Sequence, residues 1–426
     1  MDNRWKGKEK ESKKPSRWEV RDEQKEKEAN AYEVFANLLI DKIKEVKGNW
    51  KKPWFTNSQM SWPKSIYGKP YHGVNALMLS FLCEKEGYSL PVFCTGKRLK
   101  DFNYQAGENG SRVPATDADG KKLPLAHINK GETGFPVFIY VPVVIHKETK
   151  EHIKIEEYDQ LSDEEKKEYD VYTNKKVYRV FNVDQTNLKE VRPEFYQKLQ
   201  NENKPQEKEY DGETFTFDPL DIIINDSEKY WICPIKLMYQ DGAYFSPSRN
   251  EITLPFKKQF IQLGNGESFY GTAFHEMAHS TGLKERLARL DYATEELVAE
   301  TSAAMVCHRY GMDKYVKEDS VKYLSGWLKN LKENPEFIRT LLKDVKDATT
   351  LIFSRVEAAR AVYLKKEPLL DGRTEDDESV EMDSEAVSVE GEPAALLADK
   401  KQGEEEGTTE SARVSRETLE KLRFSR

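Results

Sequence analysis

A helix that carries the pattern His-Glu-x-x-His constrains the fold of this chain more than any other feature of its sequence. The pattern is formed by His275, Glu276 and His279 within residues 268–282, and Gly282 fits the left-handed residue that ends such a helix. Histidines four residues apart lie on one helix face, so two imidazoles can point at one ion. Glu276 lies about 100° around the helix from His275, where it can reach a water on the ion without being a ligand.

A hydrolytic zinc site requires this arrangement. Neutral imidazoles hold Zn²⁺, the ion lowers the pKa of a bound water, and the glutamate accepts the proton. We therefore expect His275 and His279 to bind Zn²⁺ and Glu276 to be the catalytic base. The alternative is a pair of histidines on a helix surface with a glutamate between them.

A second helix is expected at residues 293–310. Asp291 or Thr294 would be its N-cap, and Gly311 would follow its last turn. This helix is close enough in sequence to supply the further ligand that a site with two histidines needs, which is often a carboxylate.

Glu296 and Glu300 share one face of this second helix. We expect Glu296 to bind the metal and Glu300 to orient a ligating histidine from behind. This order of acids resembles that of the gluzincin metallopeptidases. Glu295 on its own is expected to lie on a solvated helix face. The alternative ligands are Asp291, Glu295 and His308.

Length and composition limit the class of protein. The 426 residues predict two or three domains, and a charged fraction of 33% against 38% hydrophobic residues predicts that part of the chain is disordered. No apolar run reaches about 18 residues and no secretory signal is present, so we expect no membrane span and a cytoplasmic location. The four cysteines form no Cys-x-x-Cys pair and are expected to be buried or free thiols: Cys83, Cys94, Cys233 and Cys307.

The charge is unevenly distributed along the chain. Residues 371–410 contain 15 Asp/Glu and 3 Lys/Arg, so they carry −12, whereas the whole chain carries −8 and the remainder therefore +4. A weakly basic body with an acidic tail is compatible with nucleic-acid binding.

The first half of the chain reads as a mixed α+β domain. We expect an amphipathic helix from Ala29 to Gly48, a second helix at residues 76–86, and strands at residues 91–95, 135–141 and 177–183. Residues 107–134 are expected to be mainly loop, and a short solvated helix is expected at residues 161–169 within an insertion.

An aromatic and basic stretch follows the first helix. Its tryptophans and tyrosines have two interpretations, which are packing against the next helix and a stacking platform for the bases of single-stranded DNA, with lysines along the phosphates. On the second interpretation the DNA-binding residues are Trp50, Trp54, Trp62, Tyr67, Lys69, Tyr71, Asn75, Lys97, Arg98 and Lys100.

The second half begins with short strands before the metal helix. We expect a strand at residues 232–235, a hairpin at residues 243–255 that turns at residues 247–250, and helices at residues 323–332 and 337–364 that pack around the metal helices. An extended peptide could add to the edge of the strand before the metal helix.

The order of these motifs resembles the ArdC-like antirestriction proteins of mobile genetic elements over roughly residues 29–364. The motifs are Tyr-Gly-Lys-Pro-Tyr-His-Gly-Val-Asn at residues 67–75, Phe-Asn-Val-Asp-Gln at 181–185, the hairpin at 244–252 and the two metal helices. The insertion and the acidic tail depart from the family pattern.

The resemblance implies an α+β fold of two domains, an N-terminal domain that binds single-stranded DNA and a C-terminal zincin-like metallopeptidase domain, between charged disordered tails. It marks Tyr71, Gly73 and Asn75 as the signature of the first domain. The expected segments are a charged arm at 1–28, the DNA-binding domain at 29–194 with an insertion near 147–179, a linker at 195–214, the metallopeptidase domain at 215–364 and an acidic tail at 365–426.

The function implied is protection of incoming DNA from host restriction, with single-stranded DNA and a restriction enzyme or another protein substrate as partners. A metal that only stabilises the fold is the alternative to catalysis. The chain would then be a DNA-binding protein without peptidase activity. A metallopeptidase of unknown substrate is the other alternative.

Overall fold

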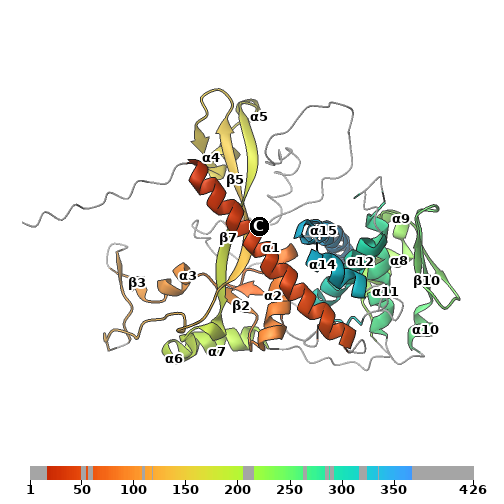
Figure 1. Cartoon of the computed structure of the whole chain (residues 1–426), viewed down its shortest axis with the longest axis horizontal. Coiled ribbons are helices and arrows are strands. Elements are labelled where there is room, and N and C mark those ends of the chain that lie inside the picture. Colours follow the sequence, from red (N-terminus) through yellow and green to blue (C-terminus); the bar gives the residue numbers. More distant parts are fainter. Residues whose placement is uncertain are drawn as a thin grey trace, which may run out of the picture.

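The computed structural model describes most of the chain between Arg17 and Lys366 (Figure 1). The described ranges are 17–48, 54–55, 61–107, 111–117, 119–204, 215–261, 266–283, 287, 292–315, 324–333 and 335–366. The acidic tail at 367–426, the first part of the charged arm, Trp50 and Asp291 lie outside the described residues.

Two helices and a five-stranded sheet form the centre of the first half. The long helix α1 (Arg17–Gly48) crosses the front of the molecule in Figure 1 and packs on α2 (Gly73–Glu86). The expected helix is confirmed, but it begins earlier, so the part of the charged arm after Arg17 is helical. Glu28 explains part of this extension, because it forms ion pairs with Lys175 and with Arg339.

The five-stranded sheet has the order β1-β2-β7-β5-β6. The strands are β1 (Lys64–Ser65), β2 (Val92–Cys94), β5 (Phe135–His146), β6 (His152–Ile153) and β7 (Tyr169–Asn182). Strands β1 and β2 are parallel and the other neighbours are antiparallel. The ladder between β5 and β7 runs from Phe135 opposite Val180 to His146 opposite Tyr169, so the two strands project beyond the sheet as a long ribbon.

The insertion is smaller than expected. The returning strand begins at Tyr169 rather than Val177, because Val171 and Tyr169 pack with Val144 and Tyr158 in a small core at the tip of the ribbon. Two short helices, α4 (Ile155–Gln160) and α5 (Asp163–Lys166), complete the tip. The expected helix at α5 is confirmed, with a capping box between Ser162 and Glu165.

Two expectations for the irregular parts of the first half were incomplete. The expected loop contains β4 (Arg112–Pro114), which pairs with β3 (Tyr104–Ala106). The expected linker begins instead with the helix α7 (Pro193–Glu202), whose Tyr196 and Leu199 are buried in a cluster of the first half. The remaining elements here are α3 (Gly96–Asp101), the 3-10 helix η2 (Val183–Gln185) and α6 (Leu188–Val191).

The second half combines a three-stranded sheet with a group of helices. The expected hairpin and helices are confirmed. The sheet has the order β8-β10-β9, with strands β8 (Ile235–Met238), β9 (Tyr244–Ser246) and β10 (Glu251–Pro255). The helices are α8 (Asp218–Asn225), α9 (Ser227–Tyr230), α10 (Lys257–Ile261), α11 (Glu267–Thr281), α12 (Tyr292–Arg309), α14 (Leu324–Glu333) and α15 (Pro335–Lys366).

The ends of the two metal helices match the sequence only in part. Gly311 has a φ of +69° after α12, as expected of a residue that follows a helix. Gly282 has a φ of −81°, so the expectation of a left-handed residue there was wrong. Thr294 is not the cap of α12, because the helix already begins at Tyr292.

The two halves share one hydrophobic core. A single buried cluster contains Phe35 of α1, Met78 of α2, Leu297 of α12, Trp327 of α14 and Leu341 of α15. The helix α15 contacts α2 as well as α8, α11 and α12. The α+β class and the two kinds of domain are therefore confirmed, but the domains are packed together rather than joined only by a linker.

The four cysteines are buried and free, as expected. Among the described residues, no helix is long and apolar enough to cross a membrane.

Candidate metal centre and nucleic-acid surface

The helix α11 places two histidines in the interior of the second half. Phe274, Met277 and Ala278 pack into the hydrophobic cluster of this half, which fixes the orientation of the helix. The intervening face carries His275 and His279, whose rings lie with centroids 4.7 Å apart. The i, i+4 spacing thus brings the two imidazoles together as the sequence predicts.

Glu296 completes a group of three side chains that could hold a metal ion. The Nε2 atoms of His275 and His279 are 3.0 Å apart. The carboxylate oxygens of Glu296 lie 3.7 Å from Nε2 of His275 and 3.5 Å from Nε2 of His279. All three ligand atoms lie within 4.8 Å of one another, and among the described residues no other group of His, Cys, Asp and Glu meets this criterion.

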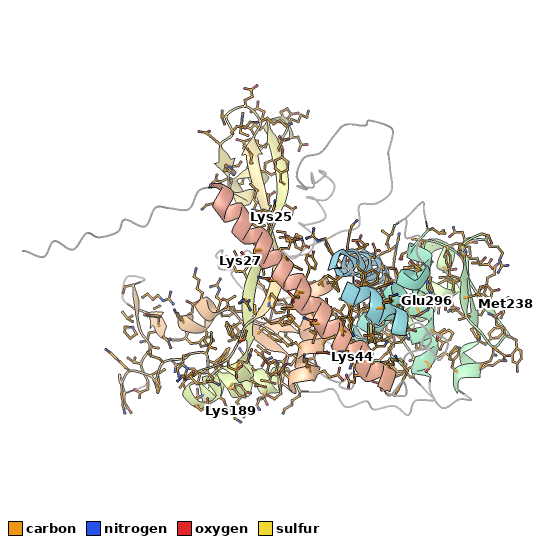
Figure 2. All side chains as sticks on the ribbon, in the orientation of Figure 1. Lys25, Lys27, Lys44, Lys189, Met238 and Glu296 are labelled. Atoms are coloured by element: carbon orange, nitrogen blue, oxygen red, sulfur yellow. The ribbon has the colours of Figure 1, made fainter. Side chains whose placement is uncertain are left out.

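The donor set fits a divalent metal ion. Tetrahedral zinc with bonds of about 2.0 Å separates its ligand atoms by about 3.3 Å, and the observed separations of 3.0–3.7 Å bracket this value. In Figure 2 Glu296 lies among the helices of the second half. Two imidazoles with a carboxylate suit zinc and also other first-row metals.

Each imidazole faces a further carboxylate through its other nitrogen. Glu300 Oε1 lies 3.5 Å from Nδ1 of His275, and Glu295 Oε1 lies 3.3 Å from Nδ1 of His279. The contact of Glu295 with His279 is a hydrogen bond, which favours the tautomer that leaves Nε2 of His279 available to a metal, whereas the contact of Glu300 with His275 is at ion-pair distance. The expectation that Glu295 lies on a solvated face was wrong, because its side chain is only 16% exposed and contacts a histidine.

The carboxylates also change the protonation of His279. Burial alone would lower the pKa of this imidazole, but the hydrogen bond to Glu295 and the charges of Glu276 and Glu296 raise it above its usual value. Protons therefore compete with a metal ion for His279 more strongly than for an imidazole of ordinary pKa. Glu276, whose charge contributes to this raised pKa, is 3% exposed.

His308 does not belong to this group. Its ring stacks on Phe55 at 4.3 Å between centroids and lies 5.7 Å from the ring centroid of Trp62. Burial lowers the pKa of His308 to about 4, so the side chain is neutral in the junction between the two halves.

A strand edge lies beside the metal helix. The strand β9 is at one edge of the three-stranded sheet and contacts α11, as does the central strand β10. Tyr244 on this edge is exposed, and so is Met238 on the opposite edge strand β8 (Figure 2).

Several aromatic residues of the expected DNA platform are packed inside the protein. Trp54 and Trp62 are buried, and Trp54 stacks on Phe81 of α2. The indole of Trp62 donates a hydrogen bond of 2.6 Å to the carbonyl oxygen of Tyr71. Residue Tyr71 is itself half-buried. Packing rather than base stacking therefore explains the two tryptophans, because both rings are used by the core.

Asn75 is also a structural residue. Its side-chain amide donates to the carbonyl of Phe138 at 2.6 Å and accepts from the N–H of Phe138 at 2.9 Å. These two buried hydrogen bonds satisfy the backbone N–H and carbonyl of Phe138, which lies in β5. The side chain of Asn75 is 5% exposed, and its expected contact with DNA stays a prediction.

The remaining candidates lie on the surface around α3. Tyr67 is 55% exposed, and the guanidinium of Arg98 lies 5.7 Å from its ring centroid. Lys69, Lys97 and Lys100 are exposed on the same part of the chain.

Sequence reasoning missed Tyr104 and Arg112. Tyr104 is 47% exposed, with the guanidinium of Arg112 4.3 Å from its ring centroid. Arg112 and Arg98 both pair with Asp101, at 2.6 Å and 3.5 Å, which links the two tyrosines through one carboxylate. We call Tyr67, Arg98, Asp101, Tyr104 and Arg112 the tyrosine–arginine surface. Residues 104–106 and 112–114 flank a glycine, and this pattern could have predicted the hairpin that exposes Tyr104 and Arg112.

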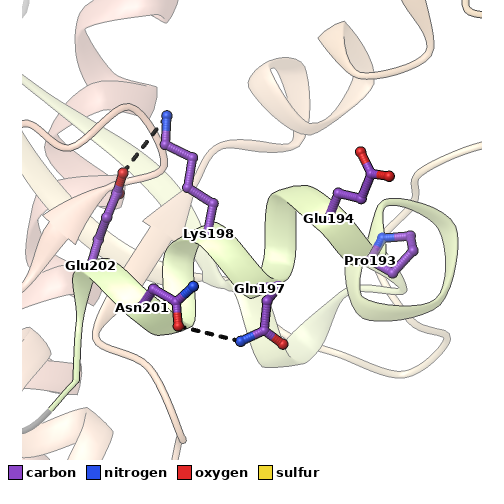
Figure 3. Close-up of a pocket in the computed structure, with 6 residues that line it drawn as sticks. All are labelled: Pro193, Glu194, Gln197, Lys198, Asn201 and Glu202. Atoms are coloured by element: carbon purple, nitrogen blue, oxygen red, sulfur yellow. Dashed lines mark hydrogen bonds and ion pairs between the residues drawn. The ribbon is translucent and has the colours of Figure 1, made fainter.

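A shallow pocket on α7 offers little chemistry. Its lining comes entirely from one helix, where Lys198 pairs with Glu202 and Gln197 bonds Asn201 (Figure 3). These groups satisfy one another, and no residue from another element converges on them.

Comparisons with known proteins identify both halves. Residues 29–183 match a family model described as the N-terminal domain of anti-restriction factor ArdC. Residues 233–341 match a family model described as a zincin-like metallopeptidase. The crystal structure of the metal-free antirestriction protein ArdC from plasmid R388 superposes with a TM-score of 0.50 at 22% identity, covering 77% of this chain and 98% of that one.

Curated relatives are longer than this chain. Two proteins from Escherichia coli, both named DNA primase TraC, are 27% identical over 336 residues and 26% identical over 315 residues. These matches cover 74% and 71% of this chain but only 19% and 25% of the relatives.

Proposed function

Because the chain belongs to the ArdC-like antirestriction proteins, we propose that it binds single-stranded DNA and cleaves a peptide bond at a zinc centre, protecting the incoming DNA of a mobile genetic element in the cytoplasm. The convergence of His275, His279 and Glu296 beside Glu276 is the observation that carries the enzymatic part. The tyrosine–arginine surface carries the DNA-binding part.

The proposed metal ligands are Nε2 of His275, Nε2 of His279 and a carboxylate oxygen of Glu296. Zn²⁺ bound there would supply Lewis acidity towards a carbonyl and lower the pKa of a water. Glu300 and Glu295 hold the two imidazoles from behind, so that each presents Nε2 to the ion.

Glu276 is the proposed general base. Its carboxylate accepts the proton of the attacking water and returns a proton to the departing amine. Burial of Glu276 excludes bulk water, which strengthens its electrostatic interactions with the reacting groups. The exposed edge of β9 would hold an extended peptide by backbone hydrogen bonds next to α11.

Single-stranded DNA would lie across the tyrosine–arginine surface. Bases stack on exposed aromatic rings with about 1–3 kcal/mol each, and arginines and lysines follow the phosphates. Tyr67→Ala combined with Tyr104→Ala should weaken binding of an oligonucleotide at least tenfold in fluorescence anisotropy. Tyr178→Ala is the matched control, because Tyr178 is similarly exposed on β7. Equal losses in both variants would contradict this assignment of the surface.

A plasmid-transfer assay against a restricting host tests the enzymatic part. Glu276→Gln should keep the zinc and the DNA affinity but lose both peptide cleavage and the part of protection that depends on cleavage. Peptide cleavage that persists in Glu276→Gln would exclude a catalytic role for this residue.

A structural metal is the second candidate. Structural zinc sites are closed, and the residues around this one are largely buried, with His275 2% exposed. On this account the zinc stabilises the shared core, and the protein protects DNA by binding alone. Full protection by Glu276→Gln, together with unfolding on chelation, would favour it.

A further inference from the structure

We infer that Lys314 is a positioning residue for the metal ligand His275 and that it acts through the carboxylate of Glu300. The inference rests on the proposed metal site and adds to it a residue from outside both metal helices. Lys314 follows α12, three residues after Gly311.

The contacts form a continuous line from the lysine to the ligand. Lys314 Nζ donates to Glu300 Oε2 at 2.8 Å, and the other oxygen of the same carboxylate, Oε1, lies 3.5 Å from Nδ1 of His275. The side chains of Lys314, Glu300 and His275 are 5%, 0% and 3% exposed. Water therefore contributes little to the solvation of Glu300, and the position of its carboxylate depends on the lysine.

This dependence has a chemical consequence for His275. An ionised carboxylate accepts the Nδ1 proton and leaves Nε2 as the lone-pair donor that a metal requires. Lys314 holds Oε2 of Glu300, so that Oε1 of the same carboxylate stays turned towards Nδ1 of His275 and orients its ring.

The backbone holds Lys314 in place from several directions. The N–H of Trp54 donates to the carbonyl oxygen of Lys314 at 2.7 Å, and Nζ also donates to the carbonyl oxygen of Tyr315 at 2.6 Å. The N–H of the preceding residue, Asp313, donates to the buried Glu267 at 2.7 Å. The first half of the chain, through Trp54, therefore takes part in fixing the group that orients the metal ligand.

The stem of Lys314 fits closely against the metal helix. A Cβ atom at Gly271 of α11 would lie 3.1 Å from Cδ of Lys314. Glycine at this position lets the lysine pass close to the helix and reach Glu300.

A buried ion pair can also act on stability alone, so the experiment separates the two roles. The full-length protein is prepared as wild type, Lys314→Met, Glu300→Gln and the double variant, with Lys42→Met as the control. Lys42 has the same exposure of 5% and a salt bridge of 2.9 Å to Glu84, but it lies between α1 and α2. Folding is checked by circular dichroism, Zn²⁺ affinity is measured by chelator competition, and the visible spectrum of bound Co²⁺ reports the geometry of the site.

Lys314→Met and Glu300→Gln are each expected to weaken Zn²⁺ binding about 10–100-fold and to alter the Co²⁺ spectrum. The double variant should bind as Glu300→Gln does, within about threefold, because Lys314 acts only through Glu300. It also leaves no unpaired buried charge, so it remains testable if Lys314→Met fails to fold. Lys42→Met should lose stability but keep both the affinity and the spectrum.

Unchanged affinity and spectrum in folded Lys314→Met or in the double variant would overturn this inference alone. Losses that multiply in the double variant would also overturn it, because they would mean that Lys314 acts independently of Glu300. A wild-type protein that binds no Zn²⁺ would overturn the proposed metal site and this inference with it.

Discussion

Replacing Asn75 by alanine tests whether this residue of the family signature supports the fold or contacts DNA. The side chain makes two buried hydrogen bonds, one to the carbonyl and one to the N–H of Phe138. Removing it leaves two backbone groups of β5 without these partners, at about 1–3 kcal/mol each. We therefore expect Asn75→Ala to lower the free energy of unfolding by about 2–6 kcal/mol.

Urea unfolding followed by circular dichroism measures this loss. Ser80→Ala is the control, because Ser80 lies on the same helix with the same exposure of 5%, and its hydroxyl has no hydrogen-bond partner among the described residues. It should change the free energy of unfolding by less than about 0.5 kcal/mol. Oligonucleotide binding by folded Asn75→Ala should remain unchanged at low temperature. Normal stability with lost DNA binding would refute the structural role of Asn75.

Three further outcomes follow from burial and charge. Zn²⁺ affinity should fall about tenfold per pH unit below the raised pKa of His279, because binding releases one proton; a chelator competition that shows no pH dependence would contradict this. His308 has a pKa of about 6.5 in the unfolded chain and about 4 in the folded protein, so between these pH values it binds a proton only when unfolded. The free energy of unfolding, measured by urea titration, should therefore fall by about 2 kcal/mol from pH 7 to pH 5. His308→Gln should reduce that difference, and an equal difference in the variant would exclude His308 as its source. Residues 1–204 and 215–426 expressed separately should each lack a cooperative thermal transition, since the core is shared; two independent transitions would contradict this.

Local sequence signals predicted the elements that depend on local physics. Helical spacing gave α11, α12 and α15, and the polar turn at residues 247–250 gave the β9–β10 hairpin, where Asn250 has a φ of +49°. The i, i+4 spacing also predicted the contact between His275 and His279, because that contact lies within one helix.

Long-range packing explains what the sequence could not predict. Whether Trp54 stacks on a base or on Phe81 depends on a partner that is distant in sequence, and composition does not contain that information. The environment of Glu295 was predicted wrongly for a similar reason. The crossing of α12 over α11 brings two successive turns of α12 to the histidines, so that three of its acids face them.

The helix α7 shows the same limit. A polar composition indicated a linker, but two apolar side chains anchor the segment. The hydroxyl of Tyr196 donates a 2.7 Å hydrogen bond to Asp184, and only the folded chain brings this partner near. A few apolar residues are enough to anchor a short helix when they pack into a hydrophobic core and a polar side chain of the helix binds a partner.

Zinc titration of the wild type beside Glu296→Ala and Glu295→Ala tests the central claim most directly. The account predicts one equivalent of tightly bound Zn²⁺ in the wild type, because two imidazoles and the carboxylate of Glu296 converge. Glu296→Ala should lose this tight binding, whereas Glu295→Ala should keep it with an affinity about 10–100-fold weaker. Unchanged stoichiometry and affinity in Glu296→Ala would contradict the assignment of the metal centre.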